Sequence, residues 1–315
     1  MNTARPRIAV VGMGAIGTVT AEAIDADRYD VISCRRSSQH PMSVLRDGVA
    51  HVIGGQVVSD PAALEPVDWV VLATKAVSDP SAWLDRLVGP QTKVAVLQNG
   101  IDLRRRVRRW VRAAQVVPVT VMIAAERTAA NEVTVVHENE LVTEATPLAV
   151  EFAGLFGPQL RVRTASDYRS EAWRKLMLNV VVNPMTTITG GSAIDCLNDT
   201  LLPTTRTILK EALHVAEATG IDLTWNEVDD SIERIRRIGA HLSSMQVDFR
   251  LGRPTEHEFI SGAVIENAES VGVDVPVIRA MHAMLVQLST TPTVADQPGH
   301  RATDPADLDV VSRTC

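Results

Sequence analysis

The stretch IAVVGMGAIGTVTAEAIDA, residues 8–26, decides the fold of this chain. Its first four residues are apolar and mostly β-branched, as in a buried strand, and residues 18–26 favour a helix. Gly12, Gly14 and Gly17 stand between the two in the pattern GxGxxG. A strand, a glycine turn and a helix in this order form a dinucleotide-binding unit. The sequence therefore predicts a Rossmann-type cofactor domain.

Each glycine of this turn has its own task. A side chain at Gly12 would block the tight turn, and one at Gly14 would keep the backbone away from a pyrophosphate. Gly17 allows the helix to pack closely on the strand. The helix then offers its free N–H groups and the positive end of its dipole to the phosphates. The predicted phosphate-binding residues are the whole turn: Gly12, Met13, Gly14, Ala15, Ile16 and Gly17.

The residues after a second predicted strand, residues 30–34, indicate which cofactor binds. NAD enzymes carry an acidic residue there, which hydrogen-bonds the adenosine ribose. This chain has Arg35 and Arg36 instead. Two guanidinium groups suit a 2′-phosphate, and each charge-assisted hydrogen bond contributes roughly 1.5–3 kcal/mol. The sequence predicts NADP (NADPH) rather than NAD, and two solvated arginines at a strand end are the alternative.

Two further predicted strands, residues 67–73 and 93–97, end in polar residues. Ligands of open α/β sheets bind beyond the carboxyl ends of the strands. Lys75 and Asn99, which follow these two strands, are therefore candidate site residues. From the residues alone, a surface lysine and a turn asparagine are equally good interpretations.

Beyond about residue 166 the strands give way to helical patterns. The predicted fold class is α/β, with an N-terminal Rossmann-type doubly wound sheet followed by an all-helical C-terminal domain. In the first predicted helix Lys175, Asn179 and Asn183 are spaced by four, so they lie along one face. Such a polar stripe suits a wet cleft, with a solvated face as the alternative. The predicted domains are 1–166 (NADP-binding), 167–290 (helical, substrate and catalysis) and 291–315 (an irregular tail).

The segment GRPTE, residues 252–256, precedes another predicted helix. Thr255 is expected to cap this helix. Glu256 would then lie in the first turn, where the helix dipole favours a carboxylate whatever its function. A structural role for Glu256 is therefore the alternative to a functional one.

Composition sets further bounds. The chain has 315 residues, 45% hydrophobic and 22% charged, which indicates roughly two globular domains. A net charge of -7 argues against general nucleic-acid binding. The six arginines within residues 104–112 have helical spacing and are interpreted as a solvated face, with an anion-binding patch as the alternative. Apolar stretches fall short of a membrane span, and no signal-peptide pattern opens the chain. Cys34, Cys196 and Cys315 fit neither a disulfide framework nor a metal site. We expect a cytoplasmic protein with free thiols.

Together these segments resemble the ketopantoate reductase family over nearly the whole chain, from Gly12 to Pro276. The matching pieces come in family order: GMGAIG (12–17), TKA (74–76), QNG (98–100), WRK (173–175) with Asn179 and Asn183, SSM (243–245) with Asp248, and GRPTE (252–256). The resemblance implies an oxidoreductase that reduces 2-dehydropantoate, a small 2-oxo acid, to pantoate with NADPH. The product leads to pantothenate and coenzyme A. A homodimer is the family-level expectation.

The resemblance also implies residue roles. Lys175 would be the general acid, Glu256 its carboxylate partner in substrate binding, and Lys75 would lie near the nicotinamide ribose or the substrate. Asn99 and Glu256 would contact the cofactor as well. The implied polar lining of the substrate pocket is Asn99, Asn179, Asn183 and Ser244.

This assignment fits the chemistry of ketone reduction. Hydride arriving at a ketone carbon leaves charge on the oxygen, which a nearby ammonium can stabilise and then protonate. The chain departs from the family at His257 and Glu258, where isoleucine and aspartate are common, and His257 is interpreted as an extra pocket base or a surface histidine. Three functions follow in order: ketopantoate reduction, reduction of another 2-oxo acid or ketone, and a non-catalytic NADP-binding sensor.

Overall fold

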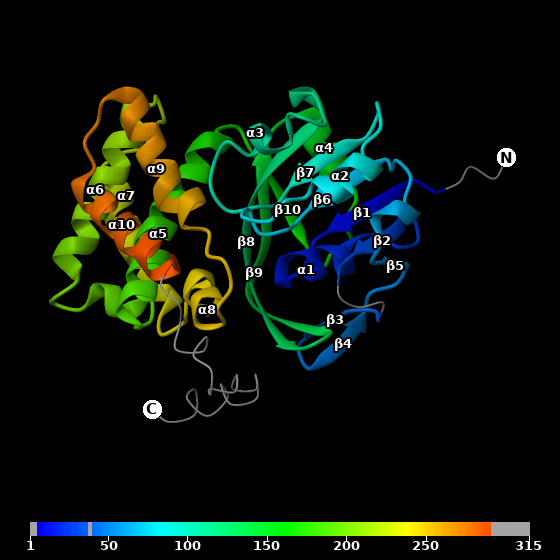
Figure 1. Ribbon diagram of the computed structural model, residues 1–315, viewed down its shortest axis with the longest axis horizontal. Coiled ribbons are helices and arrows are strands. Elements are labelled where there is room, and N and C mark those ends of the chain that lie inside the picture. Colours follow the sequence, from blue (N-terminus) through cyan, green and yellow to red (C-terminus); the bar gives the residue numbers. More distant parts are fainter. Residues whose placement is uncertain (1–4, 37–39, 291–315) are drawn as a thin grey trace.

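The structure of the chain is a computed structural model that describes residues 5–36 and 40–290, without the side chains of residues 137–139. A part that contains the sheet and a part built of helices lie side by side (Figure 1). The helix α5 (Tyr168–Thr189) opens the helical part. The predicted tail, residues 291–315, lies outside the described residues.

The sheet has ten strands in the order β4-β3-β9-β8-β7-β6-β1-β2-β5, with β10 beside β9. The strand bounds are β1 Arg7–Val11, β2 Asp30–Cys34, β3 Ser43–Arg46, β4 Val49–Val52, β5 Gln56–Val58, β6 Trp69–Leu72, β7 Lys93–Val96, β8 Val116–Ala129, β9 Glu132–Glu144 and β10 Arg161–Ala165. The pairs from β5 through β2, β1, β6 and β7 to β8 are all parallel. All four predicted strands are present, shifted by no more than a few residues.

Helices cover both faces of this parallel sheet. Alternate residues of a strand point to opposite faces, so Ile8 and Val10 join a core with α1 (Ala15–Ala23) and α4 (Pro147–Ala153). Ala9 and Val11 belong to a second core, which α2 and α3 close from the other side. The bounds of these two helices are Ser81–Leu87 and Leu103–Val107. The predicted doubly wound fold is confirmed.

The long hairpin of β8 and β9 was not predicted. The start of β8 pairs in parallel with β7, and the rest of β8, from Val119 to Ala129, pairs antiparallel with β9. The hairpin curves along the boundary between the two parts and reaches β3 and β4 (Figure 1). In β8 the residues beyond Val121 are partly buried or exposed, so this far half lacks the apolar pattern by which a buried strand is recognised. The sheet is therefore mixed rather than purely parallel.

The helical part packs around α5. Its buried face shares one core with side chains from each of the later helices α6 to α10. The α5 residues in this core include Trp173, Leu176, Met177 and Val180. The bounds of these helices are α6 Leu202–Ala218, α7 Asn226–Ile238, α8 Ser244–Arg250, α9 His257–Val271 and α10 Pro276–Thr290. Short 3-10 helices span Pro61–Ala63, Ala113–Gln115 and Ile194–Leu197. The predicted all-helical second half is confirmed.

The two described cysteines are free thiols, as expected. Burial raises the pKa of Cys34 to about 12 and that of Cys196 to about 11, so both thiols stay protonated at neutral pH. Cys315 lies outside the described residues. Over residues 5–36 and 40–290, no helix combines the length and the apolar character of a membrane span.

Candidate active site

The glycine turn follows β1 directly, and two of its glycines are required by contacts within the protein. Gly12 has a φ of +97°, and a Cβ there would lie 2.6 Å from the backbone nitrogen of Thr74. A Cβ on Gly17 would lie 2.0 Å from the carbonyl oxygen of Gly12. Both distances are far below van der Waals contact. The steric tasks predicted for Gly12 and Gly17 therefore match the structure.

Gly14 differs from its two neighbours. A Cβ on Gly14 would meet no protein atom within 4 Å, so the space outside this residue is open. Gly14 is also the N-cap residue of α1, and no side chain caps the N–H groups of the first turn. Backbone donors at a helix N-terminus that face open space suit a pyrophosphate. The turn therefore fits the phosphates of a dinucleotide.

Positive charge gathers around this turn. Nη2 of Arg127, near the end of β8, donates to the carbonyl oxygen of Met13 at 2.7 Å. Partial desolvation and the positive charges of Arg35 and Arg253 lower the pKa of Arg127. Arg253 comes from the helical part of the chain. The sequence did not indicate Arg127 and Arg253 as site residues, because only the unpredicted hairpin and the packing of the two parts bring them here.

The two arginines after β2 lie differently. Nη1 of Arg35 donates to the carbonyl oxygen of His40 at 2.9 Å and to Oδ1 of Asn131 at 3.1 Å. Arg35 is thus tied to the turn of the β8–β9 hairpin. Arg36 is exposed. Their predicted contact with a 2′-phosphate stays a prediction.

Glu256 lies between the two parts of the molecule. Only 4% of this residue is exposed. Its Oε1 accepts from the backbone N–H of Ala76 at 2.7 Å, and its Oε2 accepts from Nδ2 of Asn99 at 2.8 Å. Ala76 and Asn99 follow β6 and β7, whose carboxyl ends meet at one edge of the sheet. The buried carboxylate is therefore held by both strand tips.

Lys75 supplies the positive charge of this cluster. Its Nζ lies 2.7 Å from Oδ2 of Asp248 and 3.7 Å from Oε2 of Glu256. Both carboxylates belong to the helical part and are nearly inaccessible to solvent, whereas 42% of the Lys75 side chain is exposed. A buried carboxylate is strongly destabilising unless it is paired. We call Lys75, Asn99, Asp248 and Glu256 the Glu256 cluster.

Glu256 directly precedes α9, but its side chain does not cap that helix. It occupies the N-cap position without a side-chain capping bond, because its oxygens reach across to Ala76 and Asn99. The expectation that Thr255 caps the helix is wrong, since Thr255 Oγ1 instead lies 2.8 Å from Nδ1 of His257. His257 is partly buried, and this burial is the main cause that lowers its pKa. It is thus not a plain surface histidine.

Lys175 lines a narrow pocket between β7, β8 and α5. Its Nζ donates to the carbonyl oxygen of Val121, which fixes the ammonium at the pocket wall. Asn99 lines the same pocket, so one residue belongs both to this pocket and to the Glu256 cluster. The lining residues are Gln98, Asn99, Gly100, Thr120, Val121, Ala172, Lys175, Leu176 and Asn179. The structure thus brings together Lys175, Asn179 and Asn99.

Two predicted lining residues lie elsewhere. Asn183 is buried one helical turn beyond Asn179, and Ser244 is exposed at the start of α8. Neither is among the described residues that line the Lys175 pocket. Their roles in substrate binding stay predictions.

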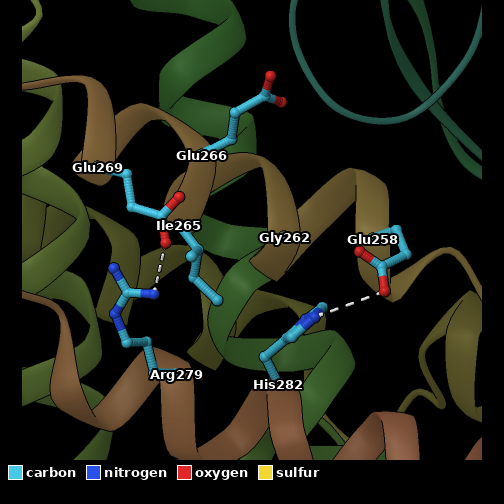
Figure 2. Close-up of a pocket in the computed structure, with 7 residues that line it drawn as sticks. All are labelled: Glu258, Gly262, Ile265, Glu266, Glu269, Arg279 and His282. Atoms are coloured by element: carbon cyan, nitrogen blue, oxygen red, sulfur yellow. Dashed lines mark hydrogen bonds and ion pairs between the residues drawn. The ribbon is translucent and has the colours of Figure 1, made fainter.

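A second depression lies in the helical part and is lined by α9 and α10 alone. Within it Glu269 pairs with Arg279 and Glu258 with His282 (Figure 2), whereas Glu266 pairs with Arg105 of α3. None of the predicted site residues lines it. The candidate active site is therefore the pocket of Lys175 together with the Glu256 cluster.

Known proteins match this chain over most of its length. The family model described as ketopantoate reductase PanE/ApbA matches residues 8–147, and that of the ketopantoate reductase PanE/ApbA C terminal matches residues 167–289. A 2-dehydropantoate 2-reductase of Mycobacterium tuberculosis is 31% identical over 291 residues, which cover 90% of this chain and 98% of that protein. The chain belongs to the ketopantoate reductase family. It is accordingly an NAD(P)-dependent oxidoreductase.

Solved structures share this fold over about nine-tenths of the chain. A 2-dehydropantoate 2-reductase from Geobacter metallireducens has a TM-score of 0.81 at 22% identity, covering 89% of this chain and 99% of that one. A D-mandelate dehydrogenase, solved with NADH and anilino(oxo)acetate, has a TM-score of 0.80 at 20% identity, covering 90% and 98%. At these identities the likeness concerns the fold alone.

Proposed function

We propose that this protein reduces 2-dehydropantoate to pantoate with NADPH, with Lys175 as the general acid and Glu256 as a ligand of the substrate hydroxyl. The observation that carries the proposal is the double role of Asn99, whose amide binds Glu256 while the same residue lines the Lys175 pocket. An acid and a buried carboxylate thus act in one site.

The proposed acid–base chemistry rests on Lys175. When bound, NADPH supplies a hydride to the ketone carbon of the substrate. The Lys175 ammonium stabilises the charge that develops on the ketone oxygen and gives that oxygen a proton. The contact with the Val121 carbonyl supports this role, because it holds the ammonium on the pocket wall before substrate binds.

The proposed substrate contacts follow the groups of 2-dehydropantoate, which has a carboxylate, a ketone and a hydroxyl. Asn99 and Asn179 are neutral donors in the pocket and bind a carboxylate without adding charge. Glu256 accepts one N–H at each oxygen, and a carboxylate has about four acceptor sites, so it accepts a substrate hydroxyl as well. Asn183 and Ser244 complete the proposed lining on the basis of the resemblance.

The proposed preference for NADPH rests on charge. The turn from Gly12 to Gly17 holds the pyrophosphate, and the arginines after β2 hold the 2′-phosphate. The open space at Gly14 and the positive charges of Arg35, Arg127 and Arg253 support this assignment. Lys75, Asn99 and Glu256 would lie toward the nicotinamide end, since they occupy the tips of the neighbouring strands or bind to them.

A second candidate function is the reduction of another 2-oxo acid or ketone on the same scaffold. His257 and Glu258 favour it, because they replace the isoleucine and aspartate common in the family directly beside Glu256. The similarly folded D-mandelate dehydrogenase was solved with a different 2-oxo compound. A non-catalytic sensor is disfavoured by the intact Lys175 and Glu256.

The test of the proposed function is NADPH oxidation by the purified protein with 2-dehydropantoate as the only carbonyl compound. A panel of other 2-oxo acids and ketones is run in parallel. We expect the highest kcat/KM for 2-dehydropantoate. A higher value for another compound would establish the second candidate, and NADPH binding without reduction of any compound in the panel would establish the sensor.

Three further assignments stay proposals. We propose the domain division at residue 166, a homodimer and a cytoplasmic location. Limited proteolysis, light scattering after gel filtration, and fractionation of the producing cells test them in turn.

A further inference from the structure

Arg106 differs from the other arginines of its run. It lies in α3, where Arg105 is exposed and pairs with Glu266 of α9. Arg106 turns the other way, toward the tip of β7. Its Nη2 donates to the carbonyl oxygen of Asn99 at 2.7 Å, and its Nη1 donates to Oε1 of Gln98 at 3.1 Å. The interpretation of the whole run as a solvated face is therefore wrong for Arg106.

The same guanidinium also contacts the helical part of the chain. Its central carbon lies 4.7 Å from the ring centroid of Phe259, in the first turn of α9. This is the geometry of a cation–π contact. Arg106 thus touches the segment that directly follows Glu256.

Gly100 is enclosed by these two residues. A Cβ on Gly100 would lie 2.7 Å from Nη2 of Arg106 and 2.4 Å from the carbonyl oxygen of Phe259. Its φ of +95° is also unfavourable for other residues. The turn after β7 is therefore clamped between α3 and α9.

The turn after β7 carries two side chains, Gln98 and Asn99, that hydrogen-bond to other parts of the site. Nδ2 of Asn99 donates to Glu256 at 2.8 Å, and Nε2 of Gln98 donates to Oγ1 of Thr74 at 3.0 Å. Thr74 in turn packs against Gly12 of the cofactor turn. Arg106 is thus linked to the carboxylate of Glu256 through Asn99, and to the cofactor turn through Gln98 and Thr74.

Arg106 keeps its charge in this partly buried place. Desolvation lowers its pKa to about 10, and the negative charge of Glu256 opposes that shift. At neutral pH the guanidinium therefore remains protonated and offers its fixed fork of donors.

We propose that Arg106 is a positioning residue of the active site: its guanidinium fixes the turn after β7, so that Asn99 is aimed at Glu256 and Gln98 at Thr74. It acts through these residues and not on the substrate. The proposal rests on the proposed function for its kinetic readout, and a second readout is independent of substrate.

The kinetic test compares Arg106→Ala, Arg106→Lys and the matched control Arg105→Ala, which removes the neighbouring exposed arginine. We expect Arg106→Ala to lower kcat/KM for 2-dehydropantoate about ten- to a hundredfold, as for the loss of charge-assisted hydrogen bonds. The Kd of NADPH should change less than kcat/KM, by no more than about threefold, since the glycine turn keeps its contacts with the phosphates even where Asn99 shifts at the nicotinamide end. Arg106→Lys should recover part of the loss, and millimolar guanidinium should raise the activity of Arg106→Ala alone. Arg105→Ala should stay within about twofold of the wild type.

The substrate-independent readout is the side-chain amide resonance of Asn99 in the protein without ligands. It should shift in Arg106→Ala and stay in place in Arg105→Ala. If the wild type reduces a different 2-oxo acid, the proposed function fails and the same variants are compared on that compound. If the wild type reduces no compound of the panel, the Asn99 resonance alone tests whether Arg106 positions Asn99.

Two results would overturn the proposal. One is an Arg106→Ala variant with wild-type kcat, KM and Asn99 resonance. The other is a loss that follows the melting temperature and responds neither to lysine nor to guanidinium, which would make Arg106 a stabilising residue only. If Arg106→Ala does not fold, Arg106→Lys and Phe259→Leu take its place, and unchanged kinetics and resonance in both would likewise overturn it.

Discussion

The glycine turn and the Glu256 cluster lie at the carboxyl ends of neighbouring parallel strands, yet they are built in opposite ways. The turn works through missing side chains, because any Cβ on Gly12 or Gly17 would collide with the backbone. The cluster works through charged side chains, and its bond from Ala76 to Glu256 joins residues 180 positions apart. One region is local and steric, whereas the other is long-range and electrostatic.

Because the two regions are built differently, substitutions in one should impair cofactor binding and substitutions in the other should impair turnover. In the proposed function the turn holds the phosphates by backbone donors, so changes there should affect cofactor affinity and stability. The cluster and its pocket are proposed to hold the reacting end, so changes there should affect turnover. The following predictions test this separation, from the largest expected effect to the smallest.

The largest effect is expected for Lys175→Ala. Removing a general acid lowers turnover by about 10²–10⁴-fold. The Kd of NADPH should stay close to the wild-type value, because Lys175 lies in the pocket and not at the glycine turn. Stopped-flow kinetics and a fluorescence titration with NADPH measure the two quantities. Lys210→Ala, at an exposed lysine of α6, is the control, and equal turnover in both variants would remove Lys175 from the mechanism.

The second prediction compares two alanine substitutions in the glycine turn. Gly12→Ala should destabilise the fold by about 1–3 kcal/mol or more, because it combines a positive φ with a collision. Gly14→Ala should leave the melting temperature nearly unchanged, since its Cβ meets no protein atom, yet weaken NADPH binding about tenfold or more. Thermal unfolding and calorimetric titration measure both effects. Full NADPH affinity in Gly14→Ala would contradict the phosphate role of the turn.

The third prediction concerns cofactor choice. Replacing Arg35 and Arg36 together by alanine should weaken NADPH binding about ten- to a hundredfold. NADH binding should change much less, because NADH lacks the 2′-phosphate. Binding of each cofactor is titrated in parallel. The control replaces Arg108 and Arg109, two exposed arginines elsewhere. Equal losses for NADPH and NADH would refute the 2′-phosphate contact.

The sequence predicted the local region more fully than the long-range one. The strand, the turn and the helix from Arg7 to Ala23 are neighbours in the chain, so their pattern contains the whole unit. Lys75 and Asn99 were found by their places after predicted strands. Their contacts with Glu256 appeared only in the structure, since no spacing rule joins such distant segments.

Other features were beyond the sequence for physical reasons. The outer half of β8 is only partly buried or exposed and pairs across to β9, so its pattern gave no sign of a buried strand. Arg127 reaches the cofactor turn only because of this hairpin. Arg106 could not be told from Arg105 until α3 was placed against β7 and α9. Asp248 is part of a motif that resembles the family, but the sequence gave it no role. The structure shows that it forms an ion pair with Lys75.

The most direct test of the central claim uses two substrates and one variant. The claim is that buried Glu256 binds the hydroxyl that distinguishes 2-dehydropantoate from 3,3-dimethyl-2-oxobutanoate, which is identical except that it lacks this hydroxyl. The measurement is kcat/KM of the wild type and of Glu256→Ala with each compound. We predict that the substitution lowers kcat/KM at least about tenfold more for 2-dehydropantoate than for the analogue. Equal losses for both compounds would contradict the account, because Glu256 would then hold the two parts of the protein together without recognising the substrate.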